Sequence, residues 1–131
     1  KRVGNISYSG LKTAVVNYMH KLEQRGETPN KADICASFQK TAVDMLVDTA
    51  TAAVEQTGIR TLCLAGGVAA NSYLRDKLKA EGERRGAVVY YPPMSLCTDN
   101  AAMICARARG MIAEGVAAAK LDLNAVSYLK L

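Results

Sequence analysis

Apolar residues recur every three to four positions over four long stretches of this chain, and this spacing predicts four amphipathic helices. The first two are expected over residues 10–24 and 31–56, with Ser9 as the N-cap of the first and Gly58 ending the second. Residues 5–8 are a candidate short strand. The apolar positions of the first helix are Leu11, Ala14, Val15, Tyr18, Met19 and Leu22, and those of the second are Ile34, Phe38, Ala42, Met45, Leu46, Ala50, Ala53 and Val54, widened by Val43 and Val47.

The second half of the chain alternates strands with helices. A buried strand, a surface helix, a second strand and a final helix opened by Asp99 are expected over residues 60–65, 68–84, 87–91 and 99–114. This βαβα order predicts two parallel strands joined by a right-handed crossover. The turns after the two strands then share the edge at which ligands bind in open α/β sheets. The inward residues of the two helices are expected to be Ala70, Leu74, Leu78, Ala101, Ile104, Cys105, Ala108 and Ile112.

Length and composition place few limits on function. With 131 residues, 50% of them hydrophobic and 22% charged, the chain suits one modest globular domain. It has no apolar run of about 18 residues, which a membrane span requires. Its first residues lack the apolar core of a signal peptide. We therefore expect a cytoplasmic protein, and the missing initial methionine suggests a fragment or a processed product.

The four cysteines and the single histidine do not predict a zinc site. No Cys-x-x-Cys pair occurs, and the neighbours of Cys35, Cys63 and Cys105 are apolar. Buried free thiols in a reducing compartment are the favoured interpretation, with disulfides as the alternative. His20 lies on the outward side of a predicted helix, which is typical of a surface residue.

The net charge of +5 is mild, but many cations cluster on the third predicted helix. Such a cluster can attract a nucleic acid or another polyanion. Acidic residues are interleaved with it, so a solvated helix face is the alternative. The cations are Arg75, Lys77, Lys79, Arg84 and Arg85, and the interleaved acids are Asp76, Glu81 and Glu83.

Gly66-Gly67, between a strand and a helix, is the strongest candidate for a binding turn. Glycine lets a ligand approach the backbone, and the N-terminus of the helix offers free N–H groups. Asn71 follows in the first turn, with an amide that can donate and accept hydrogen bonds. A tight turn without a ligand is the alternative. The segment is neither a P-loop nor the three-glycine dinucleotide motif.

Two further segments could bind charged ligands. Asp99 is either an N-terminal cap or a carboxylate aimed at a divalent metal, and one carboxylate cannot complete a metal site. Ser9 and Lys12, at the start of the first helix, could hold an anion, or they could belong to an ordinary capped helix. No nucleophile–histidine–acid arrangement can be assembled, so no catalytic residue is named.

Three segments together resemble the C-terminal part of the TsaD family, the tRNA adenosine threonylcarbamoyltransferases, also known as Gcp or YgjD. They are SYSGLKTAV at residues 7–15, LAGGVAANSYLR at residues 64–75 and CTDNAAMI at residues 97–104. The resemblance spans residues 5–115. It implies the C-terminal lobe of an actin-like, sugar-kinase-like (ribonuclease H-like) α/β ATPase fold. That lobe would cover residues 1–115, mostly helical over 1–58 and a nucleotide-binding βαβα unit over 59–115, with a tail at 116–131.

The resemblance also implies a reaction and its ligands. The family moves a threonylcarbamoyl group from its adenylate to adenosine 37 of tRNAs that read codons beginning with A. Carried over by motif, Asn71 binds substrate, Gly66 and Gly67 lie under the adenosine, and Asp99 ligates a divalent metal. Iron or zinc is expected, with magnesium as the alternative, and ATP or threonylcarbamoyl-adenylate is the nucleotide. Ser9 and Lys12 belong to a family motif and are assigned to the same binding site.

The same resemblance sets limits on the isolated chain. The other metal ligands of the family are a histidine pair in the N-terminal half, and no such pair occurs here. The chain alone is therefore expected to be inactive, and its lobe–lobe face could self-associate. The implied partners are tRNA and TsaB- and TsaE-like subunits. Another ATPase or a sugar or acetate kinase of the same fold is the alternative, as is an interaction module of a tRNA-modification complex. The family's former label, O-sialoglycoprotein endopeptidase, gains no support from these residues.

Overall fold

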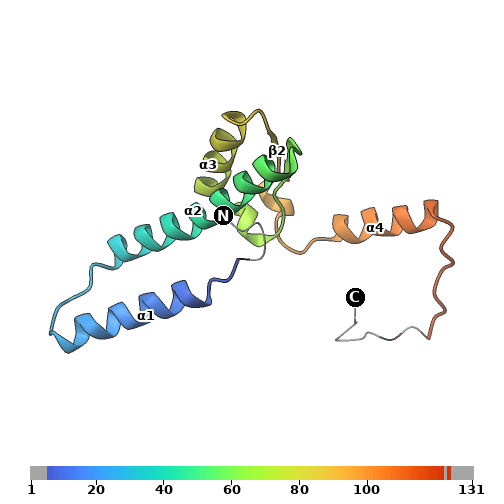
Figure 1. Cartoon of the computed structure of the whole chain (residues 1–131). Coiled ribbons are helices and arrows are strands. Elements are labelled where there is room, and N and C mark those ends of the chain that lie inside the picture. Colours follow the sequence, from blue (N-terminus) through green and yellow to red (C-terminus); the bar gives the residue numbers. More distant parts are fainter. Residues whose placement is uncertain (1–5, 123, 125–131) are drawn as a thin grey trace. The chain divides into compact units, whose positions relative to one another are not determined.

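The computed structural model describes residues 6–122 and residue 124, which divide into two compact units between Cys97 and Thr98. The elements of the first unit are α1 (Ser9–Gln24), α2 (Lys31–Thr57), β1 (Thr61–Cys63), the 3₁₀ helix η1 (Gly67–Ala70), α3 (Ser72–Glu83), β2 (Val88–Tyr90) and the 3₁₀ helix η2 (Met94–Leu96) (Figure 1). The second unit contains α4 (Ala101–Ala113). No helix in these described ranges is both long and apolar enough to span a bilayer.

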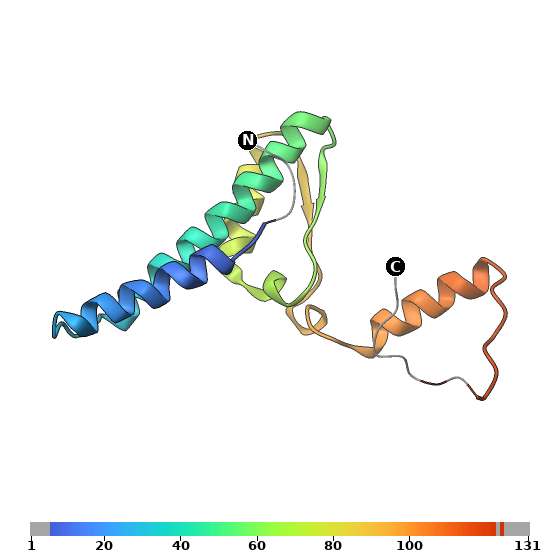
Figure 2. The same cartoon turned by 60° about the horizontal axis from the view of Figure 1, so that its bottom comes forward.

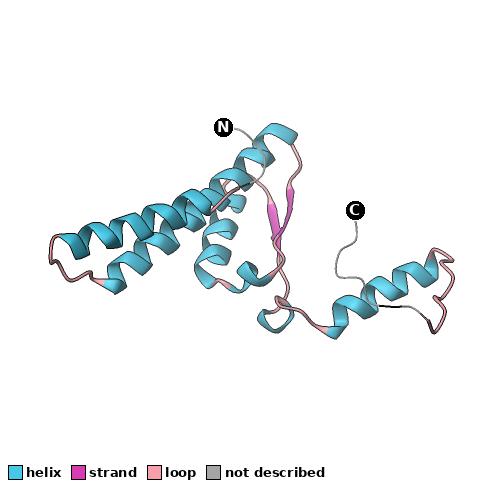
Figure 3. Ribbon diagram, turned by 90° about the horizontal axis from the view of Figure 1, so that it is seen from below, coloured by secondary structure: helices cyan, strands magenta, loops and turns pink. Residues whose placement is uncertain are grey.

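The helices α1 and α2 form a long hairpin, and their predicted extents agree with the structure to within one residue (Figures 1 and 3). At the start of α2 the Asn30 side chain accepts hydrogen bonds from the backbone N–H groups of Ala32 and Asp33. At its end Gly58 adopts the left-handed conformation, with φ of 72°, and donates to the Val54 carbonyl. This geometry favours glycine and explains why the helix stops there.

The start of α1 differs from the prediction in two ways. Residues 6–8, the described part of the predicted strand, do not form a strand. Ser9 is the first helical residue rather than the N-cap, which is Tyr8, and no side chain caps this end. Instead the Ser9 N–H donates to Oγ of Ser7, so the helix starts without the predicted serine cap.

The strands β1 and β2 of the first unit form a two-stranded parallel sheet (Figure 2). In this sheet Leu62 of β1 is paired with Val89 of β2. The parallel pairing confirms the βαβ prediction. Each strand has three residues and only its central residue is half-buried, so the prediction of a buried strand over residues 60–65 was wrong. The result is a helix-rich α/β arrangement with a small parallel sheet.

The core of the first unit lies between α2, α3 and the sheet. Its buried members are Val43 and Val47 of α2 and Leu74 and Leu78 of α3. Val43 and Val47 were expected only to widen the apolar stripe of α2, yet both are buried in this core. Around these four pack Leu46, Ala50, Leu62, Leu64, Tyr73 and Val89.

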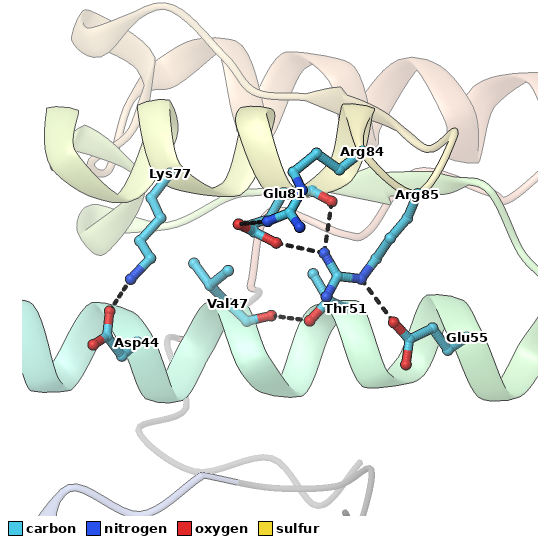
Figure 4. Close-up of polar contacts among 8 residues, drawn as sticks. All are labelled: Asp44, Val47, Thr51, Glu55, Lys77, Glu81, Arg84 and Arg85. Atoms are coloured by element: carbon cyan, nitrogen blue, oxygen red, sulfur yellow. Dashed lines mark hydrogen bonds and ion pairs between the residues drawn. The ribbon is translucent and has the colours of Figure 1, made fainter.

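Polar pairs along the α2–α3 contact flank this core (Figure 4). Lys77 of α3 pairs with Asp44 of α2, and Arg85, just beyond α3, pairs with Glu55 at 2.8 Å and with Glu81 at 2.5 Å. Part of the basic cluster on the third predicted helix is therefore neutralised by acids of its own helix and of α2.

The helix α4 and the cysteines depart from the predicted burial. None of the described residues of α4 is buried, and Ile104 and Ile112, predicted to face inward, are 73% and 75% exposed. The four cysteines are free, as expected, but the burial pattern is the reverse of the prediction. Cys97 is buried, whereas Cys35, Cys63 and Cys105 are exposed.

Candidate nucleotide-binding turn

The Gly-Gly turn follows β1 directly and adopts a conformation that other residues avoid. Gly66 has φ of 86° and ψ of 175°, a region that is essentially restricted to glycine. Its carbonyl accepts the N–H of Ala69 at 2.9 Å, which closes the first turn of η1. The sequence therefore needs glycine at position 66 for backbone reasons alone.

Gly67 has no such backbone requirement. It is absent from the positive-φ glycines of the described residues, and a Cβ built on it would meet nothing within 4 Å. Neither the local conformation nor the packing of the described chain excludes a side chain here. What glycine provides at this position is a bare stretch of backbone facing open space.

Asn71 breaks the helix that was predicted to run continuously over residues 68–84. It ends η1 and serves as the N-cap of α3, its Oδ1 accepting the N–H of Leu74 at 3.0 Å. The amide nitrogen makes no hydrogen bond to any described residue, so its two donors remain available. Ala70 is exposed, contrary to the prediction, and the neighbouring Ala69 is fully buried instead.

Asn71 and Val68 line an apolar groove of about 660 Å³. Most of the other lining residues belong to α2, among them Ile34, Phe38 and Ala42. Tyr8, at the start of α1, also lines the groove and donates its hydroxyl to the Ala42 carbonyl at 3.3 Å. Burial raises the pKa of the Tyr8 phenol, so this hydroxyl stays protonated and keeps donating at neutral pH.

Ser9 and Lys12 do not line this groove. Both are exposed at the start of α1, where the Ser9 carbonyl accepts the hydroxyl of Thr13 at 3.0 Å. Of the SYSGLKTAV motif, Tyr8 and Val15 are the residues that reach the groove. The binding role predicted from the sequence fell on the polar members of this motif, Ser9 and Lys12, and not on these two.

Asp99 belongs to the second unit and lies outside α4. The prediction that it opens the helix was wrong, because Asn100 is the N-cap and accepts the N–H of Met103 at 3.2 Å. Asp99 is exposed and forms no hydrogen bond or ion pair with the described residues. No group of three potential metal ligands occurs among residues 6–122 and 124.

Arg75 was interpreted from the sequence as one of several surface cations, and the structure places it inside. It is 9% exposed, its Nε donates to the Ala69 carbonyl at 2.5 Å, and its guanidinium lies 4.7 Å from the centroid of the Tyr91 ring. Its Nη2 donates to the Pro92 carbonyl at 2.7 Å and to Sγ of Cys97 at 3.0 Å. The signal was present, since residue 75 lies three positions before the buried Leu78 and so shares its helix face.

Comparison with known proteins identifies the family of this chain. Residues 1–106 match the family described as TsaD, tRNA N6-adenosine threonylcarbamoyltransferase. A protein of that name from Clostridium botulinum (strain Kyoto / Type A2) is 48% identical over 97% of this chain and 37% of its own length. Those from Clostridium perfringens (strain SM101 / Type A) and Clostridium beijerinckii are each 46% identical over the same shares.

The chain therefore belongs to the TsaD family of tRNA N6-adenosine threonylcarbamoyltransferases, which confirms the resemblance drawn from its three motifs. It spans about 37% of the length of the relatives it matches.

Proposed function

We propose that this chain is the C-terminal lobe of a tRNA-modifying acyltransferase with an actin-like fold, and that residues 66–71 bind the nucleotide of its donor. The donor is threonylcarbamoyl-adenylate, with ATP as the related nucleotide ligand. The acceptor is the exocyclic amine of adenosine 37 in tRNAs that read codons beginning with A. The relatives' names support the reaction, and the helix-rich α/β unit with its parallel sheet is compatible with the lobe.

The observation that carries this proposal is the open backbone at Gly67. Nothing in the described chain fills the space where its Cβ would be, although the neighbouring Ala69 is fully buried. A bare backbone beside a groove suits close approach of a planar or anionic ligand from outside. The structural alternative, a glycine required for packing, finds no support at this position.

Asn71 supplies the second part of the site. Its Oδ1 is fixed by the Leu74 N–H, which limits the rotation of the side chain, and its amide nitrogen has no partner among the described residues. A restrained amide with free donors can hydrogen-bond ligand oxygens at low entropic cost. We assign Asn71 to substrate binding, together with the backbone of Gly66 and Gly67. Ser9 and Lys12 are assigned to binding an anionic group.

The described residues offer one candidate ligand for the metal ion of the proposed reaction. Asp99 has an exposed carboxylate without a partner in the described chain, which suits a ligand of a divalent ion. It is a single ligand, and no cluster of three accompanies it among the described residues. We propose that Asp99 contributes one ligand to an iron or zinc ion, or alternatively magnesium, whose other ligands lie outside these residues. When bound, such an ion would polarise the carbonyl of the donor.

The experiment is a transfer assay with tRNA and threonylcarbamoyl-adenylate. A full-length enzyme that contains this chain should modify tRNA, and Asn71→Ala should lower turnover at least about tenfold. The chain alone should give none, because it supplies one metal ligand. Robust turnover by the chain alone, or an Asn71→Ala enzyme as active as its parent, would contradict the assignment. We propose a cytoplasmic location and TsaB- and TsaE-like subunits as protein partners. Co-purification of these subunits with the full-length enzyme tests the partner assignment.

A further inference from the structure

The side chain of Arg75 connects the two segments that leave the parallel sheet at its carboxyl edge. We propose that Arg75 is a positioning residue that holds the nucleotide-binding turn in its working geometry and biases that edge of the sheet toward an anionic nucleotide. The inference rests on the proposed function, because it concerns the same turn.

The contacts of Arg75 fall on both segments. Its Nε donates to the carbonyl of Ala69, within η1 after β1, and its Nη2 donates to the carbonyl of Pro92, after β2. Ala69 is completely buried, so the position of η1 cannot shift without disturbing this hydrogen bond. Because Asn71 ends η1, a displacement of Ala69 would also move the residue assigned to substrate binding.

The second segment is fixed by the same guanidinium. Its Nη2 also donates to Sγ of Cys97, which is 1% exposed, and its plane lies over the Tyr91 ring. Arg75 thus joins the chain before and after η2 to the Gly-Gly turn. The planar guanidinium presents N–H donors on separate nitrogens in a fixed fork, so it can reach acceptors on different elements in a geometry that the compact ammonium group of lysine does not reproduce.

The charge of Arg75 is unbalanced within the described chain. Its acceptors are two carbonyls and a thiol, and no carboxylate among the described residues pairs with it. Other basic residues of the region, such as Lys77 and Arg85, do have acidic partners. Burying an arginine without a counter-ion is costly compared with burying an apolar residue, so its presence here needs a reason. A positive potential at the edge where the nucleotide is expected supplies one.

The test compares Arg75→Lys and Arg75→Met in a full-length enzyme that contains this chain, with steady-state kinetics for threonylcarbamoyl-adenylate and for tRNA. Arg75→Lys keeps the charge but loses the multiple contacts, and Arg75→Met loses both. We expect the KM for the adenylate to rise about tenfold in Arg75→Lys and further in Arg75→Met, because losing a hydrogen bond to a charged group weakens an interaction by about tenfold or more. The KM for tRNA should stay unchanged.

The matched control is Arg84→Lys. Arg84 follows α3 and its side chain is 72% exposed, and among the described residues it pairs only with Glu81. It should leave both KM values at the parent level. If Arg75 served stability alone, its variants would lower the melting temperature and the active fraction, and hence the apparent kcat, without changing the KM for the adenylate. That result would overturn the proposal.

A second variant covers the case in which Arg75 variants do not fold. Cys97→Ala removes one acceptor and leaves the arginine in place. It should raise the KM for the adenylate about two- to threefold, since one of several hydrogen bonds is lost. An unchanged KM in Cys97→Ala would then count against the proposal. Failure of the proposed function looks different, because the parent enzyme itself would show no transfer from the adenylate.

Discussion

Gly82 of α3 lies directly against Val89 of β2: a Cβ at position 82 would sit 2.9 Å from Cγ2 of Val89. This contact is closer than real Cβ atoms approach their neighbours, and the branched valine side chain has little freedom to move away. The glycine in the last turn of this helix therefore serves close packing of helix on sheet.

Gly82→Ala should destabilise the chain by about 1–3 kcal/mol, the usual cost of overpacking a core. Gly10→Ala is the matched control, because Gly10 lies in α1 and a Cβ there meets nothing within 4 Å. It should be neutral or stabilise by up to about 1 kcal/mol. Urea denaturation monitored by circular dichroism measures both. A Gly82→Ala chain as stable as its parent would show that β2 can move aside at little cost.

The two glycines of the proposed nucleotide-binding turn should respond to alanine in opposite ways. Gly66→Ala forces a side chain into a region that only glycine occupies readily and should cost about 1–3 kcal/mol of stability. Gly67→Ala has space and an ordinary backbone, so its stability should change by less than about 1 kcal/mol.

For substrate binding, the more informative of the two substitutions is Gly67→Ala, because its effect on stability should be small. In a full-length enzyme, Gly67→Ala should raise the KM for threonylcarbamoyl-adenylate at least about tenfold while the melting temperature stays near the parent value. An alanine at position 67 that changes neither quantity would mean that the open backbone is not used by the nucleotide.

Asn71 combines a structural and a proposed functional role, and two substitutions separate them. Asn71→Asp keeps an oxygen to accept the Leu74 N–H, so stability should be preserved, helped by the negative charge at the N-terminus of α3. Asn71→Ala removes the cap and should cost about 1 kcal/mol. Both lose the amide donors, so both should impair use of the adenylate. Stability is measured by denaturation and substrate use by steady-state kinetics, and an Asn71→Asp enzyme with parental kinetics would exclude a role for the amide donors.

The long helices and the parallel sheet followed from sequence because their signals are local. The apolar period of α1 and α2 and the glycine at position 58 act over a few residues, and the strand–helix–strand order is read from consecutive segments of the chain. The break at Asn71 was missed because the helical pattern appears continuous through this residue. Asparagine favours N-cap positions, and the glycine pair before it was the other sign of a separate turn.

Other features depend on partners distant in the sequence. The burial of Arg75 rests on acceptors up to 22 residues away, at Ala69, Pro92 and Cys97, which no local pattern reveals. The exposure of Ile104 and Ile112 on α4 is equally invisible, because periodicity indicates which face is apolar but not whether anything covers it. The burial of Cys35, Cys63 and Cys105 was mispredicted for the same reason, because apolar neighbours in sequence did not mean apolar neighbours in space.

The pairing of Asp44 predicts how stability depends on pH. Its hydrogen bonds from Lys40, at 2.7 Å, and from Lys77 hold the pKa of the Asp44 carboxyl below its usual range. A carboxyl whose pKa is lowered in the folded state stabilises that state above its unfolded pKa, near 4, and this contribution is lost as pH falls through the folded value. The melting temperature of the chain should therefore decrease when the pH is lowered below about 4, and Asp44→Asn should reduce that decrease while lowering stability at neutral pH.

The control is Asp76→Asn, since Asp76 is exposed on α3 without an ion pair to the described residues. Thermal melts from pH 2 to 7 decide the matter, and an Asp44→Asn profile parallel to that of the parent over this range would show that the pair does not contribute.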